Sequence, residues 1–380
     1  MEQHLNRGIL RYFDFLPCEK QDEFFYIPPG NFDKYSGKEL LEHALGALLY
    51  YPAIKPGVVK FIQTNEHLKS IVFCLEDAIG DNQVAMAQKT LLAQLKELRQ
   101  LYSSAEIANL PLMFIRVRTP EHLHEIMHEF SDVLDLLTGF VFPKFDTKVA
   151  ESYFRIFNSL KHNCISPLYV CPILEGPEII ERERRLDALI RLKEVLDENR
   201  ESVLNVRLGV TDILGLYRMR RDVNYTIYDM SIIKDCIGEI VNFFCRCKSP
   251  YVVSGGVWEF FPDKETRAAY SAKELLQYPV FSKLIEEVRL DVINGLWGKT
   301  AIHPSQLFPI QSNYIVSYEN YQDALDIISD QGSMHGASSS KFGNKMNEYK
   351  PHQYWAEKIL TRARVFGVLK KDVSYEALFV

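Results

Sequence analysis

The amino-acid sequence predicts a (β/α)8 barrel, an α/β fold of eight parallel strands inside a ring of helices, with an N-terminal extension and a C-terminal helical segment. Short apolar runs recur along the chain, and each is followed by a longer amphipathic or charged stretch, which is typical of parallel β/α units. The runs are continuously apolar, as expected for strands that are covered on both faces. The sequence contains neither a GxGxxG fingerprint after the first run nor a P-loop, so we favour the barrel over a doubly wound sheet.

Eight runs fit the strands of the barrel. In chain order they are Leu45 to Tyr50, Ile71 to Leu75, Leu112 to Val117, Gly139 to Pro143, Leu168 to Leu174, Asn205 to Val210, Tyr251 to Ser254 and Lys299 to Ile302. Four of the intervening segments show the periodicity of helices with one apolar face. These segments are Gln83 to Leu101, Pro120 to Leu137, Pro177 to Asn199 and Ser231 to Cys247. We expect them to form part of the outer ring.

The remaining chain divides into segments on either side of the barrel. We predict an N-terminal extension over residues 1–40, the barrel over 41–310 and a C-terminal helical segment over 311–380. The extension is rich in turn residues, and the sequence assigns it no role. In the last segment, helices are predicted over Glu319 to Asp330 and Gln353 to Val365. Between them Gly332 to Asn344, rich in Gly, Ser and Asn, is predicted to be a mobile loop.

The composition excludes several classes of protein. The 380 residues carry a formal net charge of -6, which does not supply the concentrated basic field that binds nucleic acid. No apolar run reaches the roughly 18 to 20 residues that span a bilayer, and the first residues lack the order of a secretory signal. The seven cysteines, an odd number, lie mostly in apolar segments and indicate free thiols in a reducing compartment. We therefore expect a cytoplasmic protein with no nucleic-acid or membrane partner.

Polar residues directly after the predicted strands are the candidates for the active site, because (β/α)8 enzymes place it at the carboxyl ends of the strands. These residues are Glu76, Asp77, Arg116, Arg118, Lys144, Glu175 and Asp212. Glu175 and Asp212 follow consecutive strands, so their carboxylates could share Mg²⁺, with Mn²⁺ as the alternative ion. Such an ion chelates a 2-oxo acid and stabilises an enolate, and Arg116 could pair with a substrate carboxylate. Each residue alone also fits a structural role, as a helix cap or an ion-pair partner.

Seven segments, in order, resemble motifs of the citrate lyase beta subunit and malyl-CoA lyase superfamily. They are Leu48 to Pro56, Leu75 to Ile79, Ile115 to Val117, Gly139 to Lys144, Pro172 to Glu175, Leu208 to Asp212 and Gly298 to Gln306. The resemblance implies a carbon–carbon bond lyase, or the reverse condensation, with Mg²⁺ on Glu175 and Asp212. It implies that Arg116 binds the oxo-acid fragment, that the acids of the second strand, Glu76 and Asp77, orient Arg116 or nearby waters, and that the lysine after the fourth strand, Lys144, acts electrostatically.

The sequence also departs from this superfamily. Gly176 and Thr211 stand beside the two predicted metal ligands, where threonine and an acidic residue are usual. Lys55 replaces an arginine of the relatives and is a predicted substrate-binding residue. Glu348 stands where relatives that act on CoA thioesters send a catalytic aspartate into a neighbouring subunit, so it is a predicted catalytic acid. The resemblance therefore implies a homo-oligomer, a trimer or its multiple. With these departures, the sequence resembles a divergent branch of the superfamily that is described as a C–C bond lyase of TIM-barrel fold. This branch is found in bacterial stress-resistance and tellurium-resistance gene neighbourhoods.

Two classes of function stay open at this point. The first is a Mg²⁺-dependent lyase or aldolase acting on a 2-oxo or 3-hydroxy acid, free or as an acyl thioester of CoA. The second is a barrel that serves as a binding or scaffolding subunit in a bacterial stress-resistance biosynthetic system, with a thioesterase using Glu348 as a further alternative. The joint presence of Arg116, Glu175 and Asp212 favours the lyase.

Overall fold

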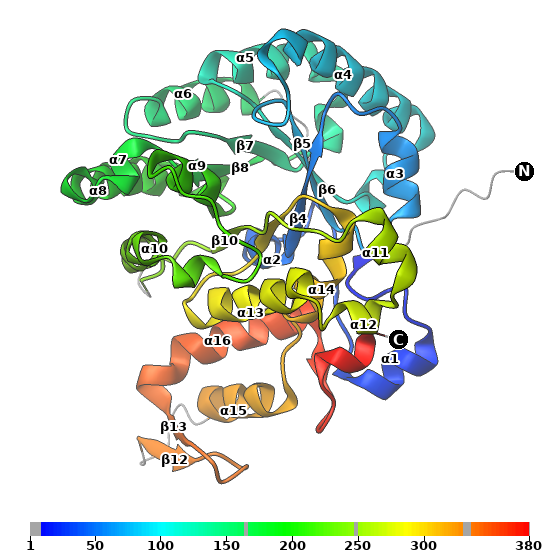
Figure 1. Ribbon diagram of the computed structural model, residues 1–380, viewed down its shortest axis with the longest axis vertical. Helices are drawn as coiled ribbons and strands as arrows, with labels where there is room; N and C mark the ends of the chain where they lie inside the picture. The colour runs from blue at the N-terminus through cyan, green and yellow to red at the C-terminus, as the bar shows by residue number, and fades with distance from the viewer. Residues whose placement is uncertain (1–8, 163–165, 247–249, 330–335, 380) are drawn as a thin grey trace, which may run out of the picture.

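The computed structural model describes residues 9–162, 166–246, 250–329 and 336–379, and its centre is a closed barrel of eight parallel strands (Figure 1). The strands are β4 (Ala47–Pro52), β5 (Ser70–Cys74), β6 (Leu112–Arg116), β7 (Gly139–Phe142), β8 (Tyr169–Leu174), β9 (Val206–Leu208), β10 (Val253–Val257) and β11 (Lys299–Ala301). β11 pairs with β4 and closes the ring. The predicted (β/α)8 barrel is confirmed, and each predicted strand overlaps an observed one.

The four consecutive strands β5 to β8 are buried along their whole length. Their side chains therefore face either the barrel interior or the covering helices, which is why each is continuously apolar. In the register, Arg116 at the end of β6 lies opposite Cys74 of β5 and Val141 of β7. The strand ends consequently form a common rim, and the residues that follow them meet there.

Helices form an arc around the strands in Figure 1. Those between barrel strands are α3 (Val58–Thr64), α4 (Val84–Leu101), α5 (Pro120–Glu129), α6 (Ala150–Lys161), α7 (Pro177–Ile180), α8 (Arg182–Glu198), α9 (Val210–Leu216), α10 (Ser231–Phe244), α11 (Lys264–Ala269), α12 (Ala272–Leu275) and α13 (Pro279–Ile293). Across the described ranges, none of the helices combines the length and apolarity needed to cross a membrane.

Two predicted helices are each divided. The helix predicted over Pro120 to Leu137 ends at Glu129, and Ser131–Leu136 forms a 3₁₀ helix, because the buried Phe130 leaves the helical conformation. The helix predicted over Pro177 to Asn199 breaks at Glu181, which is extended. Arg185 donates hydrogen bonds of 2.7 and 2.8 Å to the carbonyl groups of Ile179 and Ile180. These bonds satisfy carbonyls that the end of α7 leaves without helical partners.

The N-terminal and C-terminal elements pack together beside the barrel. The N-terminal elements are β1 (Leu10–Arg11), α1 (Cys18–Phe24), β2 (Phe25–Ile27), β3 (Asn31–Phe32) and α2 (Lys38–Ala44), and the C-terminal ones are α14 (Leu307–Ser312), α15 (Tyr318–Ser329), α16 (Tyr349–Phe366) and β14 (Val368–Leu369). β2 pairs with β14, and Tyr12 stacks on Phe366 with ring centroids 4.2 Å apart. The Tyr12 hydroxyl donates to the carbonyl of Ala44, just before β4, so this contact lies at the amino ends of the strands. The boundaries at residues 40 and 310 stay predictions.

Part of the segment predicted to be a mobile loop, Gly332 to Asn344, forms the first strand of a β-hairpin. β12 (Ala337–Ser339) and β13 (Met346–Glu348) pair in antiparallel register, while residues 332–335 of the predicted loop lie outside the described chain. The buried Asp323 of α15 accepts hydrogen bonds from Ser340 and Asn347 at 2.7 and 2.9 Å and pairs with Lys345 at 2.6 Å. These contacts to a buried carboxylate order polar residues whose composition alone indicates a loop. The two C-terminal helices are observed, and the second begins four residues earlier than predicted, at Tyr349.

Candidate active site

A cavity of about 370 Å³ opens among the carboxyl ends of the strands. Its lining comes from seven strands and the loops that follow them, and includes Tyr50, Lys55, Cys74, Asp77, Arg116, Ile173, Glu175, Arg207, Asp212, Val257, Glu259 and Thr300. Five predicted site residues, from distant parts of the chain, are therefore brought to one cavity. Lys144 lies beside it, in an adjoining hollow that shares Asp77, Glu175 and Asp212 with the cavity.

Arg116 is held at the end of β6 by the acids that follow β5. Its guanidinium lies 3.0 Å from Glu76 Oε2 and 3.4 Å from Asp77 Oδ2, and it donates to the Sγ atom of Cys74 at 3.2 and 3.3 Å. Its Cζ atom lies 5.2 Å from the centre of the Tyr50 ring. Burial opposes the charge of Arg116, but these neighbours more than offset burial and raise its pKa. The guanidinium is thus a permanent, oriented cation in the cavity wall.

Glu76 and Asp77 have pKa values that move in opposite directions. Glu76 is buried, and burial raises the pKa of its carboxyl. Asp77 is half exposed, and although burial opposes ionisation, a hydrogen bond to Glu76 and the charges of Arg116 and Lys144 lower its pKa. The Asp77 amide also donates to Glu76 Oε2 at 2.8 Å. Of these two carboxyls, Asp77 is therefore the one that ionises more readily.

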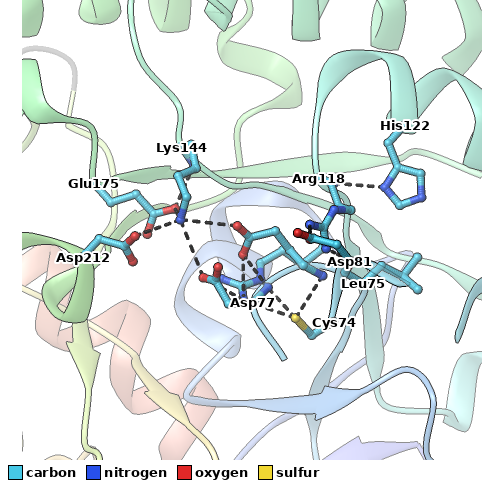
Figure 2. Close-up of polar contacts among 11 residues, drawn as sticks. Cys74, Leu75, Asp77, Asp81, Arg118, His122, Lys144, Glu175 and Asp212 are labelled. Carbon is cyan, nitrogen blue, oxygen red and sulfur yellow. Dashed lines mark hydrogen bonds and ion pairs between the residues drawn. The ribbon is translucent and has the colours of Figure 1, made fainter. Parts of the chain in front are cut away.

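Lys144 points its ammonium group into a cluster of four carboxylates (Figure 2). The Nζ atom lies 2.8 Å from Asp212 Oδ1, 3.3 Å from Glu76 Oε1, 3.7 Å from Asp77 Oδ2 and 3.8 Å from Glu175 Oε1. The backbone of Lys144 has a φ of 49°, in the left-handed region that a non-glycine residue rarely adopts, and its amide donates to Glu175 Oε1 at 2.8 Å. Such strain persists only where surrounding contacts hold it, and it is frequent at functional sites.

Glu175 and Asp212 both lie within 4 Å of this ammonium group. Glu175 follows β8 and is buried, whereas Asp212 stands in the first turn of α9 and is partly exposed. Burial and the negative charge of Asp212 raise the pKa of Glu175 to about 8. Gly209 makes room for this carboxylate, because a Cβ atom at that position would overlap the Glu175 side chain.

The two carboxylates fit a divalent metal. Their oxygens are the hard ligands that Mg²⁺ prefers, and the Lys144 ammonium group occupies a position where a cation is electrostatically favoured. In the described ranges, no group of three or more His, Cys, Asp or Glu residues is arranged to hold an ion by itself. A metal bound by Glu175 and Asp212 would therefore leave its other positions to water or substrate, as is usual for Mg²⁺.

Three predicted residues lie outside this cluster. Lys55 is exposed at the cavity rim, with Nζ 5.6 Å from the centre of the Tyr51 ring. Arg118 pairs with the exposed Asp81 at the surface (Figure 2). Glu348 ends β13, where its amide donates to His352 Nδ1 at 3.1 Å, and it does not line the cavity of its own chain. A catalytic role for Glu348 requires a second copy of the chain and stays a prediction.

The sequence analysis missed Arg207, which lines the cavity from β9. Its side chain is buried, and it donates a 2.6 Å hydrogen bond to Thr300 Oγ1 of β11. The available signal was an arginine in the middle of a predicted apolar strand. An arginine in the middle of a true barrel strand points its charge into the barrel interior, so this position alone indicates a candidate site residue.

Together, the fold and the site define a (β/α)8 barrel with an acidic mouth beside two arginines. Residues 39–368 match the family described as "C-C_Bond_Lyase of the TIM-Barrel fold", and the chain belongs to this family. The resemblance inferred from the sequence motifs is thereby confirmed. The comparison with curated proteins gave no match.

The comparison with solved structures found similar chains. The CitE protein of Mycobacterium tuberculosis, in complex with magnesium, acetoacetate and coenzyme A, is 15% identical, with 85% of this chain and 99% of that chain covered and a TM-score of 0.52. The citrate lyase beta subunit of the same organism, complexed with oxaloacetate and magnesium, is 14% identical, with 72% and 98% covered and a TM-score of 0.47. RipC from Yersinia pestis is 14% identical, with 70% and 94% covered and a TM-score of 0.46. At 15% identity, the likeness to the CitE protein shows the fold alone.

Proposed function

We propose that the protein is a Mg²⁺-dependent carbon–carbon bond lyase or aldolase that acts on a 2-oxo or 3-hydroxy acid, in cleavage or in the reverse condensation. The observation that carries this proposal is that the Lys144 ammonium group lies within 4 Å of the carboxylates of both Glu175 and Asp212, at a cavity that the guanidinium of Arg116 also lines. A metal-dependent lyase of a 2-oxo acid uses a cation site for the oxo group and a fixed positive group for the carboxylate. Membership of the C–C bond lyase family supports the type of reaction.

Glu175 and Asp212 would hold Mg²⁺, or Mn²⁺ in its place. When bound, the ion supplies a Lewis acid that polarises the 2-oxo group. Arg116 binds and orients the substrate carboxylate, because its planar guanidinium can make two parallel hydrogen bonds. Glu76 and Asp77 keep Arg116 in place, and Lys144 adds positive charge near the oxygen on which negative charge develops.

The acidic side chain of Asp77, which lines the cavity after β5, can move the protons. When a 3-hydroxy acid is cleaved, its hydroxyl oxygen becomes a carbonyl oxygen, and the electron pair of the carbon–carbon bond passes to the departing acid fragment. Asp77, whose pKa is lowered, is placed to accept the hydroxyl proton and then to return it to the fragment. Asp77 therefore ends the reaction ionised, as it began.

Two further residues, Lys55 and Glu348, extend the proposal. Lys55 at the exposed rim is placed for the distal part of an acyl thioester, if that is the form of the substrate. Glu348 would act from a neighbouring copy in a homo-oligomer. The thioesterase alternative depends on Glu348, whereas the lyase chemistry uses only side chains that one chain brings together. We therefore favour the lyase.

Calorimetric titration of the metal-stripped protein with Mg²⁺ tests this function. The titration is made with and without pyruvate, glyoxylate or oxaloacetate on the wild type, on Asp212→Asn and on Asp187→Asn, which changes an exposed acid of α8. We expect the ion and a 2-oxo acid to bind cooperatively to the wild type and to the control, and neither to bind to Asp212→Asn. A wild-type protein that binds no Mg²⁺, or an Asp212→Asn variant that binds it normally, would favour the binding-subunit alternative.

A further inference from the structure

Arg207 is a buried cation whose hydrogen-bond partners are neutral. Its residue is 1% exposed, and its guanidinium donates to Thr300 Oγ1 at 2.6 Å and to Asn205 Oδ1 at 3.2 Å. Its Nε atom is buried and has no hydrogen-bond partner. Within the part of the chain that the structure describes, no carboxylate oxygen lies within 4.0 Å of the guanidinium.

The other buried arginines show how unusual this arrangement is. Arg116, Arg185 and Arg221 each pair with at least one carboxylate. Arg362 also lacks such a partner, but its Cζ atom stacks 3.7 Å from the centre of the Trp297 ring, and it does not line the cavity. A buried charge without a counter-charge is unfavourable, and an arginine cannot relieve this by losing its proton. The protein therefore supplies no counter-ion for Arg207, and an anionic ligand could supply one.

The cavity offers a place for that anion. Arg207, Thr300 and Tyr50 all line it, and the Arg207 Cζ atom lies 5.9 Å from the centre of the same Tyr50 ring that Arg116 approaches at 5.2 Å. Two guanidinium groups thus reach one cavity around a shared tyrosine. Its volume of about 370 Å³ is near the lower end of the usual range for ligand pockets, which suits a small acid.

We propose that Arg207 binds a second carboxylate of the substrate, so that the enzyme acts on a dicarboxylic acid rather than a monocarboxylic one. This inference rests on the proposed function and specifies its substrate class: one carboxylate lies at Arg116 near the metal ligands, and the other lies deeper, at Arg207. Arg116 is already balanced by Glu76 and Asp77, whereas Arg207 supplies the unbalanced positive charge that selects the second anionic group.

A matched pair of ligands tests the proposal. 2-Oxoglutarate and 2-oxopentanoate have the same five-carbon chain and differ only in the terminal carboxylate. Their binding in the presence of Mg²⁺ is measured by calorimetry on the wild type, on Arg207→Gln and on Arg220→Gln, an exposed control. We expect the wild type and the control to bind the dicarboxylate at least about 30-fold more tightly, as for other buried charge pairs, and Arg207→Gln to lose this preference.

A stability measurement separates ligand binding from a structural role. If Arg207 mainly holds β9 to β11 through Thr300, Arg207→Met lowers the midpoint of urea denaturation. If it is an unpaired charge kept for a ligand, Arg207→Met leaves the midpoint unchanged or raises it, because replacing buried charge by apolar groups is often neutral or stabilising.

The outcomes distinguish this inference from the function on which it rests. Equal binding of both acids to the wild type, or a preference that survives in Arg207→Gln and Arg207→Met, overturns the inference, even where Mg²⁺ strengthens binding as the proposed function requires. If Mg²⁺ affects neither acid, the proposed function fails, whereas a preference for the dicarboxylate that disappears with Arg207 still supports the anion site.

Discussion

Replacing Lys144 by methionine is expected to tighten the binding of Mg²⁺. In the metal-free protein the ammonium group of Lys144 lies within 4 Å of four carboxylates, including both proposed metal ligands. A divalent ion must displace this internal cation before it can bind Glu175 and Asp212. Methionine keeps an unbranched side chain of similar length but removes the charge, so the competition disappears.

The size of the effect follows from the closest ion pair. Lys144 Nζ lies 2.8 Å from Asp212 Oδ1, and the lysine side chain is 48% exposed. Unit charges about 4 Å apart interact by ~1 kcal/mol in water and by ~4 kcal/mol at an effective dielectric constant of ~20. Because solvent screens so exposed a group, we take about 1 to 2 kcal/mol, which corresponds to a gain in Mg²⁺ affinity of about 5- to 30-fold.

Isothermal titration calorimetry at pH 7.5 measures this gain on the wild type, on Lys144→Met and on Lys148→Met. Lys148 is an exposed lysine of the same loop and is not among the residues around the carboxylate cluster. An affinity of Lys144→Met equal to or weaker than that of the wild type, with Lys148→Met unchanged, would refute the reasoning.

Three further predictions concern charge and assembly. Lys299 is fully buried, and its Nζ atom lies 2.8 Å from the buried carboxylates of both Glu287 and Asp291. Because Lys299→Met leaves these carboxylates without their cation, we expect it to lower the free energy of unfolding in urea by about 3 to 5 kcal/mol. A loss below about 1 kcal/mol would contradict this expectation. Glu175 has a pKa of about 8 in the folded state against an ordinary value of 4.5, so its contribution to the stability of the metal-free protein is complete below pH 4.5 and is lost as the pH rises to about 8. Glu175→Gln is expected to flatten that part of the stability profile, and an unchanged slope in denaturation midpoints would argue against the shift. If Glu348 acts across a subunit interface, Glu348→Gln and Asp212→Asn proteins are each inactive, and mixed oligomers regain activity; a fully active Glu348→Gln protein would show that the role is wrong.

The barrel could be predicted because parallel strands that are covered on both faces form short, continuously apolar runs in the sequence. Runs such as Leu112 to Val117 are too continuously apolar for a surface strand and too short for most helices. The ends of helices were less predictable, since they depend on distant contacts. Arg185 stabilises the break at Glu181 through carbonyl groups of the preceding turn, and the buried carboxylate of Asp323 orders a hairpin where the composition indicates a loop.

The same distinction applies to the candidate site. That Glu76, Arg116 and Glu175 share one rim follows from their places directly after parallel strands. The carboxyl ends of parallel barrel strands lie on one rim whatever the exact packing. The place of each residue after its own strand is therefore enough to predict that they share this rim. The direction of the Lys144 side chain depends on a left-handed backbone conformation that no sequence rule assigns to lysine. The missing counter-charge of Arg207 likewise depends on every side chain around it, and no single segment of the sequence contains that information.

The sequence by itself determined the order of strands and helices, the rim on which the polar residues gather and the family resemblance, because each depends on residues that are adjacent or regularly spaced along the chain. The tertiary structure alone decided which charges are buried, which carboxylates share one ammonium group and which buried guanidinium groups lack a counter-charge. Burial and electrostatic energy depend on distances of a few ångströms between residues that are far apart in the chain, and those distances exist only once the barrel has closed.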